Sequence, residues 1–380
     1  MAEKKFSTFK VASAYIGTIV GAGFASGQEV LQFFGYFGLT GLLGLILATG
    51  FFVYFGYLII KLGAELNADS HLPVIKYAGG KWIGTIIDYV ITFFLFGALT
   101  VMAAGSGALF SEQLGLPGYL GSGLLIATTL GTVLFGLNGV ISAISFIVPV
   151  LLVSVFAICG YVLISMGIPT GASQAAIRGG NPAVPFWPLS ALVYVSYNLV
   201  VAVAVLAPMG KGTADLKRIR NGALWGGLGL GLGAVAILLA MLTNMPQAVN
   251  YELPMIFVAG QLSPYIKIGY AIILFLEIYT TAVGSLYGFA ARFTKPKSKQ
   301  LKILAAAASV AALAAAQFGF TNLVRTLFPL VGYAGILMLG GLVYHQLKNI
   351  PLIGNLIPQP AYKRVEGDGD KSRDNSKDTD

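Results

Sequence analysis

Four glycines lie close together in an apolar stretch near the N-terminus and could open a polar site within it. The stretch AYIGTIVGAGFASGQEVLQFFGYFG contains Gly17, Gly21, Gly23 and Gly27. Glycine weakens a helix and permits backbone dihedrals that other residues avoid. A helix interrupted here would present carbonyl oxygens from its first half, which suit a cation, and amide N–H groups from its second half, which suit a carboxylate. The alternative is a small-residue face for close helix packing.

A second polar stripe surrounds Glu277, in the middle of the apolar stretch KIGYAIILFLEIYTTAVGSLYGFAAR. At about 3.6 residues per turn, one helix face would carry Glu277, Thr280, Thr281, Gly284, Ser285 and Gly288. A charge in mid-membrane is costly, so such acids usually serve a function. Carboxylate and hydroxyl oxygens are hard ligands that suit Na⁺ by analogy with other hard cations, and a carboxylate alone could carry a proton. The alternative is a structural glutamate that hydrogen-bonds the interrupted backbone.

A third polar group lies in an apolar stretch bounded by Pro188 and Pro208. It consists of Tyr194, Ser196, Tyr197 and Asn198. Asparagine can cap a broken helix, and tyrosine could close a pocket over a substrate. We therefore expect a second interrupted helix here, with Tyr194, Tyr197 and Asn198 at the substrate. The alternative is a set of polar residues that hydrogen-bond across helices within a bundle.

Two further charges could form a gate at the outer side. Glu29 lies beyond Gly23 by about 9 Å along a straight helix, toward the outside. Arg325 lies near the outer start of the last apolar stretch. The two could pair as an extracellular gate, or they could be two solvated charges at the rim.

The remaining polar residues favour structural roles. Asp88 is expected to meet a cytoplasmic lysine, and His71 and His345 fall in or beside cytoplasmic segments, so no metal site beyond a Na⁺ site is predicted. The glycine-rich run WGGLGLGLGA lies inside an apolar stretch and does not follow a strand, which favours helix packing over phosphate binding. No nucleophile–base pair occurs in the apolar stretches. The sequence therefore predicts no enzyme, and no cofactor other than a coupling ion.

The composition requires a membrane protein. The chain is 10% charged and 56% hydrophobic, with a mean hydropathy of +0.80, whereas soluble domains average about 25% charged residues. Such a chain must expose apolar surface to the lipid bilayer. The single cysteine, Cys159, has no partner for a disulfide. The net charge of +9 follows the topology described below, so it does not indicate a nucleic-acid partner.

Apolar stretches separated by short polar joints predict ten membrane spans, since a spanning helix needs roughly 20 apolar residues. The expected spans cover about 9–36, 41–61, 82–110, 120–137, 140–166, 187–209, 221–243, 265–291, 300–317 and 324–347. If the N-terminus is cytoplasmic, only three of the 24 basic residues fall at the outer side. They are Arg178, Lys267 and Arg325. Because Lys and Arg are retained inside during insertion, we expect both termini in the cytoplasm and the protein in the plasma membrane.

Ten spans divide into two sets of five, which would then have opposite orientations, as in the inverted repeats of many secondary transporters. The expected parts are a cytoplasmic N-terminus at 1–8, repeats at 9–166 and 187–347, and a disordered cytoplasmic tail at 362–380. The fold class is thus an all-α polytopic membrane protein with helices 1 and 6 interrupted. Tyr251–Gln261 is apolar enough for a helix across the outer face.

The motif GTIVGAGFASGQEV resembles the first helix of LeuT-fold transporters of the amino acid–polyamine–cation superfamily. The run from Ala14 to Phe34 is most similar to the YkvI-type group of proposed amino-acid permeases. The resemblance extends over the membrane part in span number and loop pattern, but its specific motif is confined to the first span.

This resemblance implies a substrate pocket between spans 1, 3, 6 and 8. The substrate carboxylate would meet the amides of Ala22, Gly23 and Phe24, next to the break at Gly21. Where members use sodium, the ion lies at positions that correspond here to Val20, Gly23, Thr280 and Thr281. Two departures matter: span 6 lacks the usual glycine at its break, and Glu277 adds a carboxylate beside the ion site, so both Na⁺ and H⁺ stay open.

The sequence thus predicts an ion-coupled symporter that works by alternating access. Its substrate is expected to be an amino acid or a related zwitterion or carboxylate, and its coupling ion Na⁺ or H⁺. The alternative is a nutrient-sensing receptor subunit on the same fold, which would bind such a solute without moving it. The sequence does not indicate an oligomeric state.

Overall fold

The computed structural model describes residues 6–135, 138–167, 181–213, 215–295 and 298–348, with the backbone alone for 138–146. These ranges are almost entirely helical and contain no β-strand. The chain divides into two units, Met1–Leu342 and Val343–Asp380. The first unit holds every candidate site residue named above. The expected tail at 362–380 lies outside the described residues.

Nine helices within the described ranges are long and apolar enough to cross a membrane. They are α4 (Thr40–Glu65), α5 (Leu72–Leu114), α6 (Gly118–Phe135), α7 (Asn138–Met166), α9 (Trp187–Lys211), α10 (Leu216–Thr243), α12 (Pro264–Phe293), α13 (Lys299–Ala315) and α14 (Phe320–Lys348). They match the expected spans 2 to 10. Helix α5 begins earlier than its expected span because a further helical stretch from Leu72 joins it across a kink at Gly80, where φ is 66°.

The first span is interrupted, as predicted, and it is interrupted twice. It consists of α1 (Thr8–Ile19), α2 (Ala22–Ala25), α3 (Gln28–Phe33) and a 3₁₀ turn η1 (Gly35–Phe37). Val20 and Gly21 have extended backbone, which ends α1. The second break lies at Gly27, whose φ of 81° is left-handed and therefore favours glycine. With these pieces, the chain supplies the tenth expected crossing.

The interruption expected in span 6 is wrong. Helix α9 runs without a break from Trp187 to Lys211. The Asn198 amide donates to the Tyr194 carbonyl one turn earlier in the same helix, at 2.9 Å, so it supports α9 and caps no broken end. Pro208 lies in the last turn, and the sole glycine of α9 is Gly210, near its end. The middle of α9 therefore contains no residue that would open the helix.

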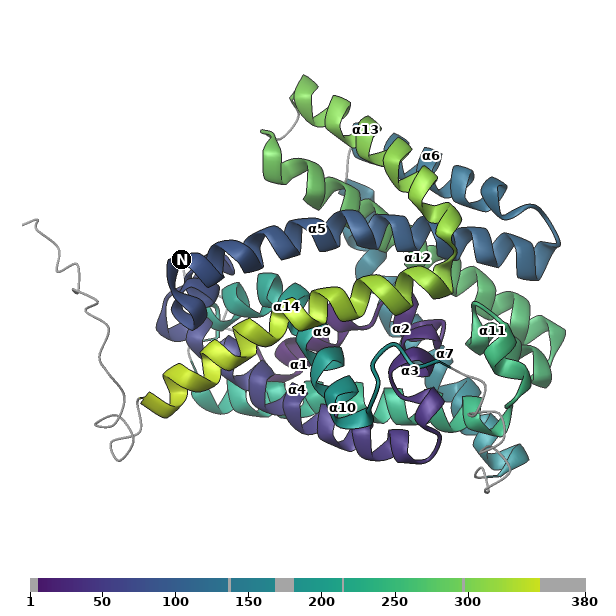
Figure 1. Ribbon diagram of the computed structural model, residues 1–380, viewed down its shortest axis with the longest axis horizontal. Helices are drawn as coiled ribbons and strands as arrows, with labels where there is room; N and C mark the ends of the chain where they lie inside the picture. Colours follow the sequence, from purple (N-terminus) through teal and green to yellow (C-terminus); the bar gives the residue numbers. More distant parts are fainter. Residues whose placement is uncertain (1–5, 136–137, 168–180, 214, 296–297, 349–380) are drawn as a thin grey trace, which may run out of the picture. The chain divides into compact units, whose positions relative to one another are not determined.

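The helices form two groups that pack within themselves (Figure 1). In the first, α4 and α1 each contact both α9 and α10. Glycines bring the backbones of α4 and α9 together, since an added Cβ at Gly63 would overlap the Ala207 carbonyl, and one at Gly210 would overlap the Ile60 carbonyl. In the second, α5, α6, α12 and α13 pack together. The short α11 (Pro254–Leu262) nearly coincides with the helix expected at Tyr251–Gln261, and it packs on α12. Spans 1, 2, 6 and 7 are thus separable from spans 3, 4, 8 and 9.

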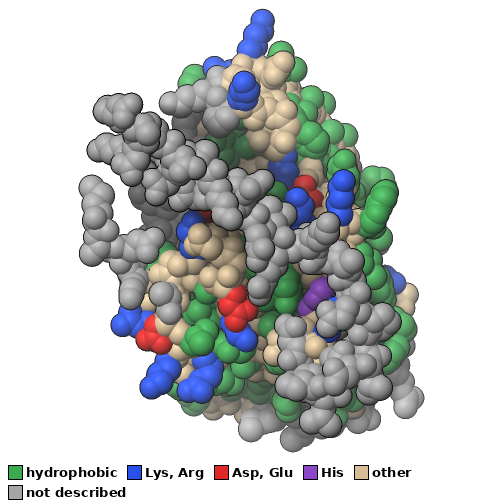
Figure 2. Space-filling model, turned by 90° about the vertical axis from the view of Figure 1, so that its left-hand side faces the viewer, with side chains coloured by type: hydrophobic (Ala, Val, Ile, Leu, Met, Phe, Trp, Pro, Cys, Tyr) green, Lys and Arg blue, Asp and Glu red, His purple; other side chains and the backbone are tan. Residues whose placement is uncertain are grey.

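Large apolar side chains on the outside of these helices are exposed. Among them are Trp82, Phe135, Ile164 and Tyr265, each more than 80% exposed. Such a surface requires lipid rather than water around it. One end of the bundle differs: Figure 2 shows Lys and Arg side chains gathered on the face where α4, α9 and α12 end. The protein is an integral membrane protein with one basic end.

Candidate substrate and ion site

Glu29 is buried in the interior of the protein, although the sequence suggested that it lies toward the outer side. It lies in the first turn of α3 and is 5% exposed. The phenol of Tyr197, from the middle of α9, donates a hydrogen bond to Glu29 Oε2. No ion pair joins Glu29 to Arg325 in the described part of the chain. The structure therefore does not bring the two expected gate residues together.

The carboxyl of Glu29 lies directly against the backbone of Gly23. A Cβ added at Gly23 would overlap Glu29 Oε1, so only glycine leaves room for the carboxyl in this position. A straight helix would separate the two residues by about 9 Å. The left-handed backbone at Gly27 turns the chain and returns the Glu29 side chain to Gly23. This second break was not predicted from the sequence, although Gly27 is one of the four glycines in the first span.

Aromatic rings surround the hydroxyl–carboxyl contact. The centroid of the Tyr197 ring lies 5.0 Å from the ring centroid of Phe328, 5.7 Å from that of Phe33 and 6.4 Å from that of Phe94. Tyr194 packs on Tyr197 at 5.6 Å. The structure thus brings Tyr194 and Tyr197 to span 1 as expected, and the enclosure they form is apolar apart from the hydroxyls and the carboxyl.

At the first break, the first amides of α2 precede its helical hydrogen bonds. Helix α2 makes its first internal bond from Ala25 N to the Gly21 carbonyl at 3.0 Å, so the amides of Ala22, Gly23 and Phe24 precede it. Ala22 and Phe24 are buried. The Gly23 carbonyl, an expected ion ligand, accepts a hydrogen bond from Ser26 Oγ at 2.9 Å.

On α12, the polar stripe is largely buried, with Glu277 3%, Thr280 2% and Ser285 6% exposed. Thr281 Oγ1 lies 3.5 Å from Glu277 Oε1, a long contact, and Glu277 Oε2 has no hydrogen-bond partner among the described residues. Thr280 Oγ1 donates to the Glu277 carbonyl at 3.1 Å. Gly284, expected on this buried face, is exposed.

No hydrogen bond among the described residues joins this stripe to Val20 or Gly23. The bond from α12 to span 1 comes from Tyr270, whose hydroxyl donates to the Ala25 carbonyl at 2.6 Å. Tyr270 lies two turns before Glu277 on the same helix face, a spacing that could have identified it in the sequence. The ion site between α12 and the break stays a prediction.

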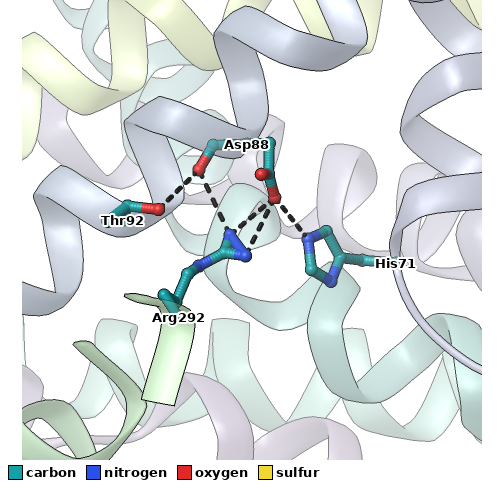
Figure 3. A network of polar contacts seen from close by, with 4 residues as sticks. All are labelled: His71, Asp88, Thr92 and Arg292. Atoms are coloured by element: carbon teal, nitrogen blue, oxygen red, sulfur yellow. Dashed lines mark hydrogen bonds and ion pairs between the residues drawn. The ribbon is translucent and has the colours of Figure 1, made fainter. Parts of the chain in front are cut away.

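A separate polar cluster joins α5 to α12 at the basic end (Figure 3). Asp88 Oδ1 accepts from Arg292 Nη1 at 2.9 Å and Nη2 at 2.6 Å, and it lies 3.0 Å from His71 Nε2. Thr92 Oγ1 donates to the Asp88 carbonyl at 2.9 Å. Asp88 meets a basic residue as expected, although the partner is an arginine rather than a lysine. No group of metal-ligating side chains occurs in the described ranges.

Comparisons with known proteins agree with this architecture. No family model matches the chain. The uncharacterized membrane protein YkvI of Bacillus subtilis (strain 168) is 32% identical over 343 residues, which cover 90% of this chain and 97% of YkvI. YyaD of the same strain is 27% identical over 329 residues, 85% of this chain and 92% of YyaD.

Three solved structures share the fold. Mhp1 in its inward-facing conformation gives a TM-score of 0.61 at 16% identity, covering 91% of this chain and 78% of that one. A Na⁺-coupled sialic acid symporter, substrate-bound and outward-open, gives 0.57 at 13%, covering 90% and 79%. MhsT in complex with L-phenylalanine gives 0.54 at 17%, covering 89% of each chain. All three have the LeuT fold, which at these identities is what the likeness shows.

Proposed function

Because the chain belongs to the family of the membrane protein YkvI and has the LeuT fold with inverted repeats, we propose that it is a secondary transporter of a small solute. The observation that carries the proposal is the doubly interrupted first span, whose free amides and buried carboxyl lie at the interior face of α9. Non-helical backbone inside a membrane persists only where protein or a water-filled cavity surrounds it. In a LeuT fold, such a break is where substrate and ion bind.

The substrate we propose is an amino acid or a related zwitterion or carboxylate. Its carboxylate meets the amides of Ala22, Gly23 and Phe24, next to Gly21. Tyr194 and Tyr197 line the same space, and Asn198 contributes through α9. Two structural neighbours are a complex with L-phenylalanine and a sialic acid symporter, and both of these compounds bear a carboxylate.

Transport is proposed to be coupled to Na⁺ or H⁺. The ion ligands expected from the sequence are Val20, Gly23, Glu277, Thr280, Thr281 and Ser285. The partnerless Glu277 Oε2 supports this assignment, because a buried carboxylate oxygen without a donor suits a cation or a proton. If Glu277→Gln and Thr281→Ala both leave ion-dependent uptake unchanged, α12 does not hold the ion.

Alternating access follows from the two helix groups. The group of α1, α4, α9 and α10 rocks against that of α5, α6, α12 and α13 around the break. Glu29 and Arg325 would meet, if at all, in another state of this cycle. The basic end faces the cytoplasm, with both termini, in the plasma membrane.

Counterflow in proteoliposomes tests the proposal. Vesicles loaded with unlabelled L-amino acids should accumulate a radiolabelled amino acid transiently, whereas protein-free vesicles should not. A nutrient receptor would bind the same amino acids, with a ligand-dependent rise in melting temperature, and would show no counterflow. A matched thermal-shift series in sodium and in choline buffer identifies the ion, since a coupled ion raises the stabilisation by substrate.

A further inference from the structure

Within the described residues, Glu29 is a buried carboxyl with no basic partner. Helices α2, α9 and α10 and the turn η1 pack on α3, and α14 contacts it through Thr321, which accepts from Gln28 Nε2 at 2.9 Å. Helix α2 has no titratable side chain, η1 has Tyr36, and the titratable groups of α9 nearest to Glu29 are Tyr194 and Tyr197. The basic residues of α9 and α10 lie at the far, basic end, where Lys211 pairs with Asp69.

The helices that enclose Tyr197 add no cation to the site. Phe94 on α5 and Phe328 on α14 contribute rings. Arg325, one turn before Phe328, makes no ion pair with Glu29, and Arg292 is paired with Asp88. Within the described chain, the Tyr197 hydroxyl is therefore the donor that compensates this carboxyl.

One hydroxyl does not stabilise a buried negative charge. An ionised carboxylate removed from water needs a cation or several hydrogen-bond donors, and in their absence it takes up a proton. The rings of Phe33, Phe94 and Phe328 pack around Tyr197, so the Tyr197 side of the carboxyl offers none of the several further oxygen ligands that a hard cation such as Na⁺ needs. A proton needs no such ligand shell.

We propose that Glu29 binds the coupling proton of transport, and that Tyr197 positions its carboxyl against the span 1 break. The proposal rests on the proposed function, in which a substrate carboxylate occupies the amides beside Gly23. Because Glu29 Oε1 lies against Gly23, an ionised Glu29 would repel that carboxylate, whereas a protonated Glu29 would not. Proton and substrate therefore favour each other's binding by the same factor.

Glu277 differs from Glu29 in its neighbours. Hydroxyls follow Glu277 on the same face of α12, which is the chemistry of a metal-cation site, and α12 belongs to the other helix group. Glu29 and Tyr197 both lie in the group that we propose to move, on the two spans beside the substrate. A proton on Glu29 thus acts on the contact between spans 1 and 6 directly.

Infrared difference spectroscopy tests the proton itself. The spectrum of the wild type minus that of Glu29→Gln, at neutral pH, should contain the C=O stretching band of a protonated carboxyl, shifted in D₂O. Tyr197→Phe should move this band to higher frequency, because the C=O group loses its hydrogen bond. A difference spectrum with carboxylate bands alone overturns the proposal. Glutamine can still accept from Tyr197, so the variant should fold, and the Tyr197→Phe shift assigns the band independently.

Transport in proteoliposomes tests the coupling, with an equimolar mixture of radiolabelled L-amino acids as the probe. An inside-alkaline pH gradient should drive accumulation by the wild type and by the control Glu65→Gln, which removes a half-exposed carboxyl on α4. Glu29→Gln should lose this accumulation by at least tenfold while it keeps counterflow, because glutamine mimics the protonated carboxyl permanently. Accumulation that Glu29→Gln retains, or that Glu65→Gln loses to the same extent, overturns the proposal.

Infrared spectroscopy and counterflow distinguish a failure of the Glu29 proton site from a failure of the proposed transport function. Wild-type vesicles without counterflow would refute the proposed transport of amino acids, and the infrared band would still decide whether Glu29 holds a proton. Counterflow without the band would retain the transporter and remove Glu29 as the proton site.

Discussion

Two carboxylates inside this protein, Asp88 and Glu29, are held in opposite ways. Asp88 receives two guanidinium hydrogen bonds from Arg292 and one contact from His71, and its side chain is 36% exposed. Glu29 receives one phenol hydrogen bond, and it is 5% exposed. The carboxylate that is closer to water has the cation, and the one in the interior has none.

The difference indicates which site is structural and which is free to bind something. An acid satisfied by an arginine joins α5 to α12 and needs nothing from solution. An acid enclosed by aromatic rings without a cation must gain a proton or a ligand in some state of the protein.

Arg292→Gln should destabilise the protein by about 2 kcal/mol, because it leaves the part-buried Asp88 carboxyl with His71 as its remaining side-chain partner. The free energy of unfolding in mild detergent measures the change. Asp88→Asn in the Arg292→Gln background should restore part of the loss. Equal stability of the wild type and Arg292→Gln would show that the ion pair between Asp88 and Arg292 does not stabilise the protein.

Gly23→Ala should slow counterflow about tenfold, which corresponds to roughly 1.4 kcal/mol. The new methyl group displaces the Glu29 carboxyl from Tyr197. Because the carboxyl is the end of a flexible side chain, stability should fall by no more than about 1.5 kcal/mol.

Gly21→Ala is the matched control for Gly23→Ala. Its added Cβ would meet no atom within 4 Å, and its φ of −126° suits any residue. It should transport as the wild type does. If both variants lose transport equally, the break requires glycine for backbone freedom, and the contact with Glu29 is not the reason.

Glu252→Gln should reduce the change in the free energy of unfolding between low and high pH, by less than about 1 kcal/mol. Glu252, between α10 and α11, accepts from Phe320 N at 3.3 Å and has no cation. Burial raises the pKa of Glu252 above its ordinary 4.5. The folded protein therefore holds this proton more tightly, so its contribution is present below pH 4.5 and is lost as pH rises through the raised pKa. A slope unchanged in the variant, measured by melting temperature against pH, would contradict this.

Lys61→Gln should change stability by about 0.5 kcal/mol or less. Lys61 and Glu65 form an ion pair one turn apart on α4, at 3.5 Å, with 26% and 50% of their side chains exposed. Added salt should leave the difference between this variant and the wild type near zero. A loss as large as that of Arg292→Gln would mean that exposure does not distinguish the pairs in this protein.

Apolar length predicted the spans, and glycine spacing predicted the first break, because both are local properties of the chain. The position of Glu29 was not predictable in this way, since it depends on Gly27 turning the chain and on Tyr197 arriving from α9. The expected break in α9 failed because it was inferred from the pattern of a repeat, whereas the residues there, including Asn198, satisfy a continuous helix. Asp88 found a basic partner as expected, but only tertiary packing could choose Arg292.

In an alternating-access transporter, the broken first span is open to each side of the membrane in turn. Cys159 is the only cysteine of the chain, so Gly21→Cys in a Cys159→Ser background would carry a single thiol, at a position with free space. In oriented membranes, an impermeant methanethiosulfonate reagent should label this thiol from either side, and a bound amino acid should change the ratio of the two rates. Labelling from one side alone, with or without amino acids, would contradict alternating access and favour a receptor.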